Sequence, residues 1–410
     1  MTPELLRDNP RFRCLWLSKA ISSTGTGVGR VALVLLVASS GPGTVSLVLV
    51  CTALPLLAGP LAGAVADRVD QRRLLAGCEA GQGVIYAVLA ITRPAISLLL
   101  PLVIAASLLA AFGSPAGKSA IRRLVPGERR SQANAFLGLA VNLQIIAGPA
   151  LGGLLAGLTG VSIAFAVNAG SFAISALLLT GLGPLPPLDH PEAVPPRAAR
   201  PGLLADTMAG LRYAQRDTVV RGLVLGTFVF ITFAAVDNVA LVFLVKQALH
   251  GSGTEYGLIA ATFGVGMVAA SVVLTRWANR RPAAFWLIGG IITGAAGTIV
   301  TGLAPSAALA GAGQVVAGIG NTADLVGTDT LVQQRVPAHM TGRAFGIVYA
   351  GAQLAGALSS AIAGPMVAFA GPRVAFAIAG AGALVGAAML VPALRSRSRL
   401  AEPPLELGQP

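Results

Sequence analysis

Residues 63–73 read Gly63-Ala64-Val65-Ala66-Asp67-Arg68-Val69-Asp70-Gln71-Arg72-Arg73. The stretch places five charged side chains between two long apolar runs, each of about the 20 residues that a helix needs to cross a bilayer. It is therefore predicted to lie at the boundary between lipid and water, where its three arginines can contact lipid headgroups. The acidic side chain of Asp67 gains no stabilisation from lipid headgroups, so we expect it to bind another part of the protein.

The composition is that of an integral membrane protein. The chain has 410 residues, of which 55% are hydrophobic and only 11% charged, whereas roughly a quarter of the residues in a soluble domain are charged. Twelve apolar stretches are candidate spans, and we predict an all-helical membrane protein with twelve transmembrane helices. The stretches cover residues 14–38, 45–65, 75–92, 96–115, 133–157, 161–183, 221–245, 256–275, 283–303, 307–328, 344–369 and 373–394.

The net charge of +13 is concentrated in alternate loops. Of the 29 Lys and Arg residues, 24 lie at the termini or in the loops on the same side as the termini, whereas the opposite loops carry only Arg93, Lys246 and Arg373. Because basic residues accumulate on the cytoplasmic side, both termini are predicted to be cytoplasmic in a multi-pass protein of the inner or plasma membrane. A charge placed in this way does not indicate a surface that binds nucleic acid.

An internal repeat relates the two parts of the chain. A shift of 211 residues places Gly160 on Gly371, and a shift of 208 places Arg72-Arg73 on Arg280-Arg281. We therefore expect two six-helix halves related by pseudo-symmetry. The predicted parts are an N-terminal half at 1–183, a Pro-rich cytoplasmic linker with an amphipathic helix at 184–217, a C-terminal half at 218–394 and a cytoplasmic tail at 395–410.

The charged loop at 63–73 resembles the signature loop between helices 2 and 3 of the major facilitator superfamily, with Asp70 and Gln71 in place of the usual Gly and Arg. Residues 334–337 with Gly342-Arg343 look like its branch of drug, macrolide and siderophore exporters. The resemblance implies a transporter that alternates access around a cavity between its halves. It also implies a gate in which the loop acid meets the start of helix 11. The residues of this gate are Gly63, Asp67, Arg68, Arg72, Arg73 and Arg343.

A second motif lies in the fifth span. Gly148-Pro149-Ala150-Leu151-Gly152-Gly153 is similar to the core of a motif associated with exporters in this superfamily. By this resemblance, the positions of interest are Gly148, Pro149, Gly152 and Gly153. We expect Gly148-Pro149 to bend helix 5 where the halves meet.

Ionisable residues inside the predicted spans are few, and each costs at least about 2.5 kcal/mol near the bilayer centre. Arg30 and Asp237 lie at nearly the same depth in the first and seventh spans, 207 positions apart, which is close to the repeat shift. One hypothesis is that they form a charge pair across the pseudo-twofold axis. The alternative is that hydroxyl groups or water satisfy each of them separately. Asp237 is also our first candidate for a proton carrier.

Four further residues complete the predicted site for substrate and proton coupling. Glu79 and Asp324 lie in the cytoplasmic portions of the third and tenth spans, where an acid can reach water or a loop arginine. Asn238 and Asn321 can hydrogen-bond either a substrate or a neighbouring helix. Neither the three Cys nor the three His residues form a metal-binding pattern, and the glycines at 25–29 lack the context of a phosphate loop, so no metal and no cofactor are expected.

These features together predict a secondary active transporter and no enzyme. By resemblance, it is a proton-coupled exporter, and a cavity with few charges suits a small amphipathic organic compound such as a drug or a siderophore. The expected partners are this substrate, protons and membrane lipids, with no nucleic acid, and we expect a monomer. Two alternatives stay open: an importer or uniporter of a small metabolite, and a membrane scaffold or sensor that binds a ligand without moving it.

Overall fold

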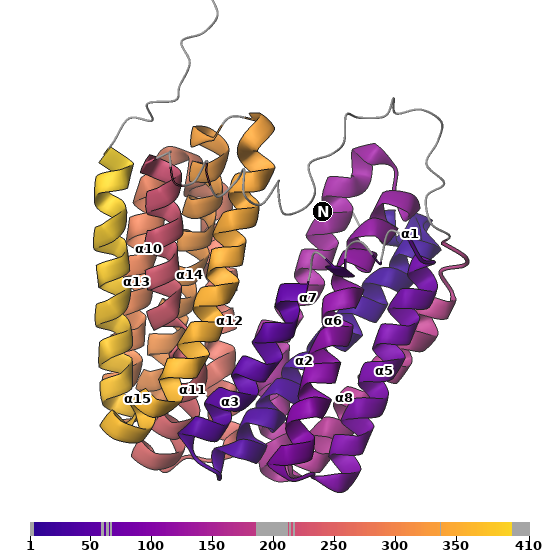
Figure 1. Ribbon diagram of the computed structural model, residues 1–410, viewed down its shortest axis with the longest axis horizontal. Coiled ribbons are helices and arrows are strands. Elements are labelled where there is room, and N and C mark those ends of the chain that lie inside the picture. The colour runs from indigo at the N-terminus through magenta and orange to yellow at the C-terminus, as the bar shows by residue number, and fades with distance from the viewer. Residues whose placement is uncertain are drawn as a thin grey trace, which may run out of the picture.

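The computed structural model describes residues 4–58, 61, 62, 65, 68–185, 212, 215, 218–336 and 338–395. Every regular element in these residues is a helix, and Figure 1 shows the helices in two bundles. The first bundle holds α1 (Glu4–Asp8), α2 (Pro10–Ala38), α3 (Pro42–Ala53), η1 (Leu54–Ala58), α5 (Gln71–Thr92), α6 (Ile96–Leu124), η2 (Gly127–Arg129), α7 (Arg130–Leu158) and α8 (Val161–Thr180). The second holds α10 (Thr218–Ala234), α11 (Asp237–Phe243), η3 (Leu244–Ala248), α12 (Gly253–Trp277), η4 (Ala278–Arg280), α13 (Ala283–Leu303), α14 (Ala307–Arg335) and α15 (Ala338–Arg395).

The predicted all-helical architecture is confirmed, and the helices agree with twelve spans. Among the described residues, nine helices are long and apolar enough to cross a membrane, and one of these covers both final spans, from Ala344 to Pro392. Gly371, with a φ of 79°, divides α15 into these two spans. Its repeat mate Gly160 has a φ of 94° between α7 and α8. Both turns need a left-handed backbone that glycine adopts without a steric cost.

The two bundles repeat the same helix lengths. Helices α6 and α14 each have 29 residues, and they begin and end 211 positions apart. Helix α3 begins at Pro42 and α12 at Gly253, also 211 positions apart. This is one of the two shifts found in the sequence, so the sequence repeat corresponds to a repeat of structure.

The bundles meet at one end of the molecule and separate at the other (Figure 1). The contacts between them run mainly from α7 to α12 and from α3 to α15. Gly153 of α7 and Gly257 of α12 meet backbone to backbone, since a Cβ added to Gly153 would lie 2.5 Å from the Cα of Gly257. Gly364 of α15 packs in the same way against Ser46 of α3. Small residues thus allow the close approach that holds this end together.

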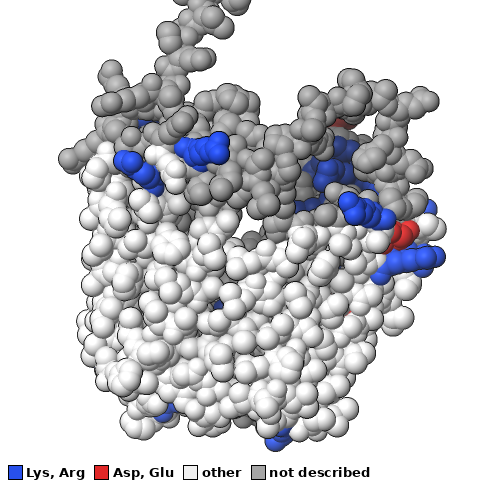
Figure 2. Space-filling model, viewed as in Figure 1, with Lys and Arg blue, Asp and Glu red and all other residues white. Residues whose placement is uncertain are grey.

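Basic side chains gather at the separated end. Figure 2 shows most of the Lys and Arg visible on this face of the molecule at that end. The grey atoms there belong to residues outside the described part. This placement agrees with the alternation of basic loops in the sequence, whereas the direction in which the protein crosses its membrane stays a prediction.

The loop between α3 and α5 is described in part. Gly63 and Asp67, the side chain of Arg343 and most of the predicted linker at 184–217 lie outside the described residues, so the predicted gate stays a prediction. Asp70 caps α5 by accepting a hydrogen bond from the Arg73 amide at 3.0 Å, and it accepts a second from the Leu185 amide at 2.9 Å. Burial raises the pKa of Asp70, but these backbone bonds outweigh it and hold the pKa below the ordinary value of 3.8.

Candidate functional site

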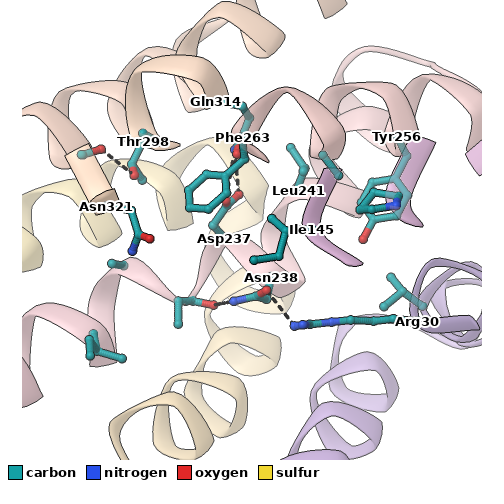
Figure 3. Close-up of a pocket in the computed structure, with 18 of the residues that line it drawn as sticks. Arg30, Ile145, Asp237, Asn238, Leu241, Tyr256, Phe263, Thr298, Gln314 and Asn321 are labelled. Carbon is teal, nitrogen blue, oxygen red and sulfur yellow. Dashed lines mark hydrogen bonds between the residues drawn. The ribbon is translucent and has the colours of Figure 1, made fainter. Parts of the chain in front are cut away.

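A cavity of about 420 Å³ lies between the two bundles. Helices α2 and α7 line it from one side, and α10 to α15 line it from the other. Most of its wall is apolar or aromatic, including Val31, Ile145, Phe230, Ile231, Leu241 and Phe263. Its polar side chains are Arg30, Gln144, Asp237, Asn238, Tyr256, Thr298, Gln314 and Asn321. Figure 3 shows that most of these polar residues come from the second bundle.

The seventh span contains a tight turn where it borders the cavity. Helix α10 ends at Ala234 and α11 begins at Asp237, and Val236 between them keeps a helical backbone, with its amide bonded to the carbonyl of Phe233 at 3.1 Å. The side-chain Nδ2 of Asn238 donates a hydrogen bond to the carbonyl of Ala235 at 3.0 Å, and the backbone amide of Asn238 donates to the same carbonyl at 3.1 Å. The apolar pattern predicted one span here, and the structure keeps one helix from Val220 to Ala248 with this turn directly before the acid.

Arg30 extends from α2 into the cavity (Figure 3). Its Nη2 donates a hydrogen bond to Oδ1 of Asn238 at 2.9 Å. The two residues are 208 positions apart, which is also the shift that relates Arg72-Arg73 to Arg280-Arg281 in the sequence. The bond therefore joins equivalent positions of the two halves across the pseudo-twofold axis.

Asp237 bonds inside the second bundle instead. Nε2 of Gln314 donates to both of its carboxylate oxygens, at 3.1 and 3.0 Å, and the Gln314 side chain is only 1% exposed. The charge pair predicted between Arg30 and Asp237 is therefore wrong for this structure. The repeat placed both residues on the wall of one cavity, but the residue that bonds Arg30 is Asn238. Arg30 and Asp237 have separate partners, and these partners are amides, whereas the alternative expected hydroxyl groups or water.

Four polar residues of the cavity wall were absent from the predicted site: Gln144, Tyr256, Thr298 and Gln314. Gln314 precedes Asn321, which was predicted and lines the cavity, by seven positions. Seven residues make about two helical turns, so the two amides lie on one face of α14. This spacing was a signal that could have identified Gln314. Tyr256 and Thr298 had no comparable signal among the many hydroxyl groups of the spans.

The structure does not bring the other predicted acids to the cavity wall. Glu79 lies within the first bundle, where its Oε1 accepts a hydrogen bond from Ser22 of α2 at 3.4 Å. Asp324 is 7% exposed and accepts a bond from Thr328, on the next turn of α14, at 3.4 Å. Asp324 therefore does not lie at the water-accessible position that the sequence predicted.

The glycines of the fifth span connect α7 to both bundles. A Cβ added to Gly148 would lie 2.6 Å from the Cα of Gly27, and Gly152 packs on α2 one turn further along. Gly153 faces Gly257 of α12, in the other bundle. Pro149, between these contacts, lines the cavity. The motif thus places α7 against one helix of each half, beside the polar residues.

Comparison with known proteins gives a family and several relatives. Residues 6–404 match the model of the family MFS_3, described as transmembrane secretion effector. The uncharacterized MFS-type transporter YfiS of Bacillus subtilis is 28% identical over 384 residues, which is 88% of each chain. The enterobactin exporter EntS of Citrobacter koseri is 26% identical over 98% of this chain and 95% of its own. The multidrug efflux pump Tap of Mycolicibacterium fortuitum is 29% identical over 78% of this chain and 80% of its own.

The fold also matches solved structures. A bacterial homologue of the human lysosomal transporter Spinster, solved in an inward-facing and unoccupied conformation, superposes with a TM-score of 0.69. The two chains are 18% identical, and the match covers 94% of this chain and 95% of that one. At this identity the likeness shows a shared fold.

Proposed function

This chain belongs to the transmembrane secretion effectors, a family of major facilitator transporters, and from that premise we propose that it is a proton-coupled exporter of a small amphipathic compound. Members of the superfamily are secondary transporters and not enzymes. The proposal concerns the direction of transport, the coupling ion and the class of substrate. It includes a monomer in the cell membrane with both termini in the cytoplasm.

Asp237, the acid that the seventh span places on the cavity wall, is the observation that carries the proposal. Ionisable residues inside a membrane span are rare, and they commonly mark ion or substrate pathways in transporters. A carboxylate at this depth costs at least about 2.5 kcal/mol, and binding a proton removes that charge. Asp237 therefore has two protonation states of very different solvation, which is what a proton-coupled cycle requires.

The cavity supports a small amphipathic substrate. Its volume of about 420 Å³ lies within the usual range of ligand pockets, roughly 300 to 1,000 Å³. Phe230 and Phe263 offer ring surfaces, whereas Arg30 and Asn321 offer hydrogen bonds from opposite halves. EntS and Tap are named as exporters of enterobactin and of drugs, and relatives of this kind favour export of an organic compound.

The separated end of the bundles is proposed to face the cytoplasm. Support comes from the basic loops, which the positive-inside rule assigns to that side. The structure then corresponds to a state in which the cavity is filled from the cytoplasm. The predicted gate between Asp67 and Arg343 would close this end in the opposite state.

The test is pH-gradient-driven uptake of a panel of fluorescent amphiphiles into everted membrane vesicles. We expect uptake by the wild type, its collapse when an uncoupler is added, and its loss in Asp237→Asn. Asp8→Asn, which makes the same change at an exposed position in α1, should transport normally.

Each of the remaining outcomes would indicate a different function. Uptake that persists with an uncoupler would indicate a uniporter. Uptake that survives in Asp237→Asn would keep the exporter and move the proton site to Glu79 or Asp324. Dye that binds to the purified protein but never accumulates in vesicles would favour the scaffold or sensor.

A further inference from the structure

The hairpin between α12 and α13 lies where two predicted spans end. The spans cover Gly253–Trp277 and Ala283–Leu303, so residues 278–282 are expected at the membrane boundary. Trp286 fixes the hairpin, because its Nε1 donates a hydrogen bond to the carbonyl of Ala278 at 3.0 Å. The Trp286 ring also packs edge to face on Phe285, with centroids 5.2 Å apart. The hairpin is therefore braced by its own aromatic side chains.

Two arginines of this hairpin lie over aromatic rings. The guanidinium carbon of Arg280 is 5.1 Å from the centroid of Trp277, and that of Arg281 is 5.6 Å from the centroid of Phe285. Trp277 and Phe285 are each 52% exposed, so both rings reach the surface. A guanidinium group stacked on a ring uses its flat face, and the N–H groups along its edge stay available for an anion.

The charge of the hairpin is unbalanced. Arg276, Arg280 and Arg281 are all exposed, and the sequence from 276 to 286 contains no acidic residue. Nor does any described carboxylate form an ion pair with these arginines. Three exposed cations and two exposed rings thus lie within one short hairpin at the predicted membrane boundary.

The equivalent loop of the first half lacks this combination. A shift of 208 places Arg280-Arg281 on Arg72-Arg73, but it also places Ala278 on Asp70. Asp70 supplies a carboxylate next to the arginines and ties the loop to Leu185. Val69 stands in place of Trp277, so an equivalent of that ring is missing. The first-half loop is partly neutralised, whereas the second-half hairpin is not.

We propose that the hairpin at 276–286 is a binding site for an anionic phospholipid of the adjacent leaflet. The exposed rings would lie at the level of the glycerol backbone, as tryptophan does at membrane interfaces. The edges of Arg280 and Arg281 would bind the phosphate and the anionic headgroup, since guanidinium groups match phosphate oxygens in pairs. Charge complementarity and the position of the rings favour this ligand over a soluble one.

Tryptophan fluorescence tests the proposal without any measurement of transport. The chain has three Trp residues, so Trp16→Phe leaves only Trp277 and Trp286, both on the hairpin. In nanodiscs that contain lipids brominated near the headgroup, brominated phosphatidylglycerol should quench this fluorescence at a lower mole fraction than brominated phosphatidylcholine. Each basic residue near a lipid surface favours anionic lipid by roughly fivefold. Because Arg280 and Arg281 act together, the preference for phosphatidylglycerol should exceed about tenfold.

The arginine changes are made on the Trp16→Phe background. The double change Arg280→Gln with Arg281→Gln should remove the preference for phosphatidylglycerol. The control, Arg72→Gln with Arg73→Gln on the equivalent loop, should preserve it. Equal quenching by the two lipids, or a preference that survives the Arg280 and Arg281 changes, would overturn the assignment. Millimolar glycerol 3-phosphate should leave the preference intact. If it removes the preference, the site belongs to a soluble phosphate and not to a lipid.

Discussion

Helix α2 and the α10–α11 pair are equivalent spans of the two halves, yet the first is a regular helix and the second contains a tight turn beside the cavity. Helix α2 runs from Pro10 to Ala38 and places Arg30 in the cavity. Its counterpart has the turn between Ala234 and Asp237. The repeat therefore provides two equivalent positions, and the differences between the halves make them complementary: a guanidinium donor on one side and an amide acceptor on the other.

The second half carries two polar side chains at this turn, where the repeat shift of 208 gives the first half Gly29 and Arg30. Asn238 donates to the carbonyl of Ala235 and at the same time accepts the bond from Arg30. Asp237, the preceding residue, instead accepts its bonds from Gln314, within its own half.

Exchanging the two residues gives the strongest test of this comparison. In the double variant Asp237→Asn with Asn238→Asp, the carboxylate would stand opposite Arg30, and Gln314 would lose its charged partner. Adding a negative charge opposite Arg30 would strengthen the bond between the two halves, so we expect dye uptake to fall more than tenfold while the protein still folds. Asn238→Gln, which keeps an amide there, should retain more activity. Normal uptake by the exchanged variant would mean that the order of the two residues is unimportant.

The glycine contact between the halves should be next in effect. Gly257→Val would push a side chain into the backbone of α7 at Gly153, and overpacking of this kind costs about 3 kcal/mol. The loss of stability would be measured by thermal unfolding in detergent, and the opening of the contact by the accessibility of cysteine probes at the closed end. Gly170→Val is the matched control, because nothing lies within 4 Å of a Cβ at Gly170. Equal effects of the two changes would contradict the close contact.

Removing the partner of Asp237 should have a smaller effect. Gln314→Leu leaves a buried carboxylate without its donor, which costs about 2 kcal/mol. We expect a lower melting temperature in detergent at neutral pH. Gln144→Leu, on the first-half wall of the same cavity, is the control and should leave the melting temperature nearly unchanged. A larger loss in the Gln144 variant would reverse the inferred asymmetry between the halves.

The smallest effect concerns the loop of the first half. Because the pKa of Asp70 lies below 3.8 in the folded protein, its carboxylate adds stability above that pH, and the contribution is lost as the pH falls through the lowered pKa. Asp70→Asn should therefore flatten the decline of the melting temperature below pH 4. Asp8→Asn should leave that decline in place. Identical acid profiles for the wild type and Asp70→Asn would rule out this contribution.

Much of the architecture could be predicted from the sequence, for a simple reason. A membrane requires long apolar helices, and basic loops mark one of its sides, so spans and repeat appear directly in hydropathy and charge. The depth of Arg30 and of Asp237 followed from the same counting. Asn321 was found because polar residues inside spans are rare. Each of these features depends on position along the chain alone.

Only the tertiary structure decided which side chains meet. One residue along a helix turns a side chain by about 100°, so the partner of Arg30 changes completely between Asp237 and Asn238 although their depths hardly differ. The turn before Asp237 and the bond between Asp237 and Gln314 depend on how the helices pack around the cavity. The hydropathy pattern gives the depth of a residue in the membrane, but it does not give the direction in which the side chain points around the helix axis. Rotation is set by packing, and here it separates the acid from the arginine.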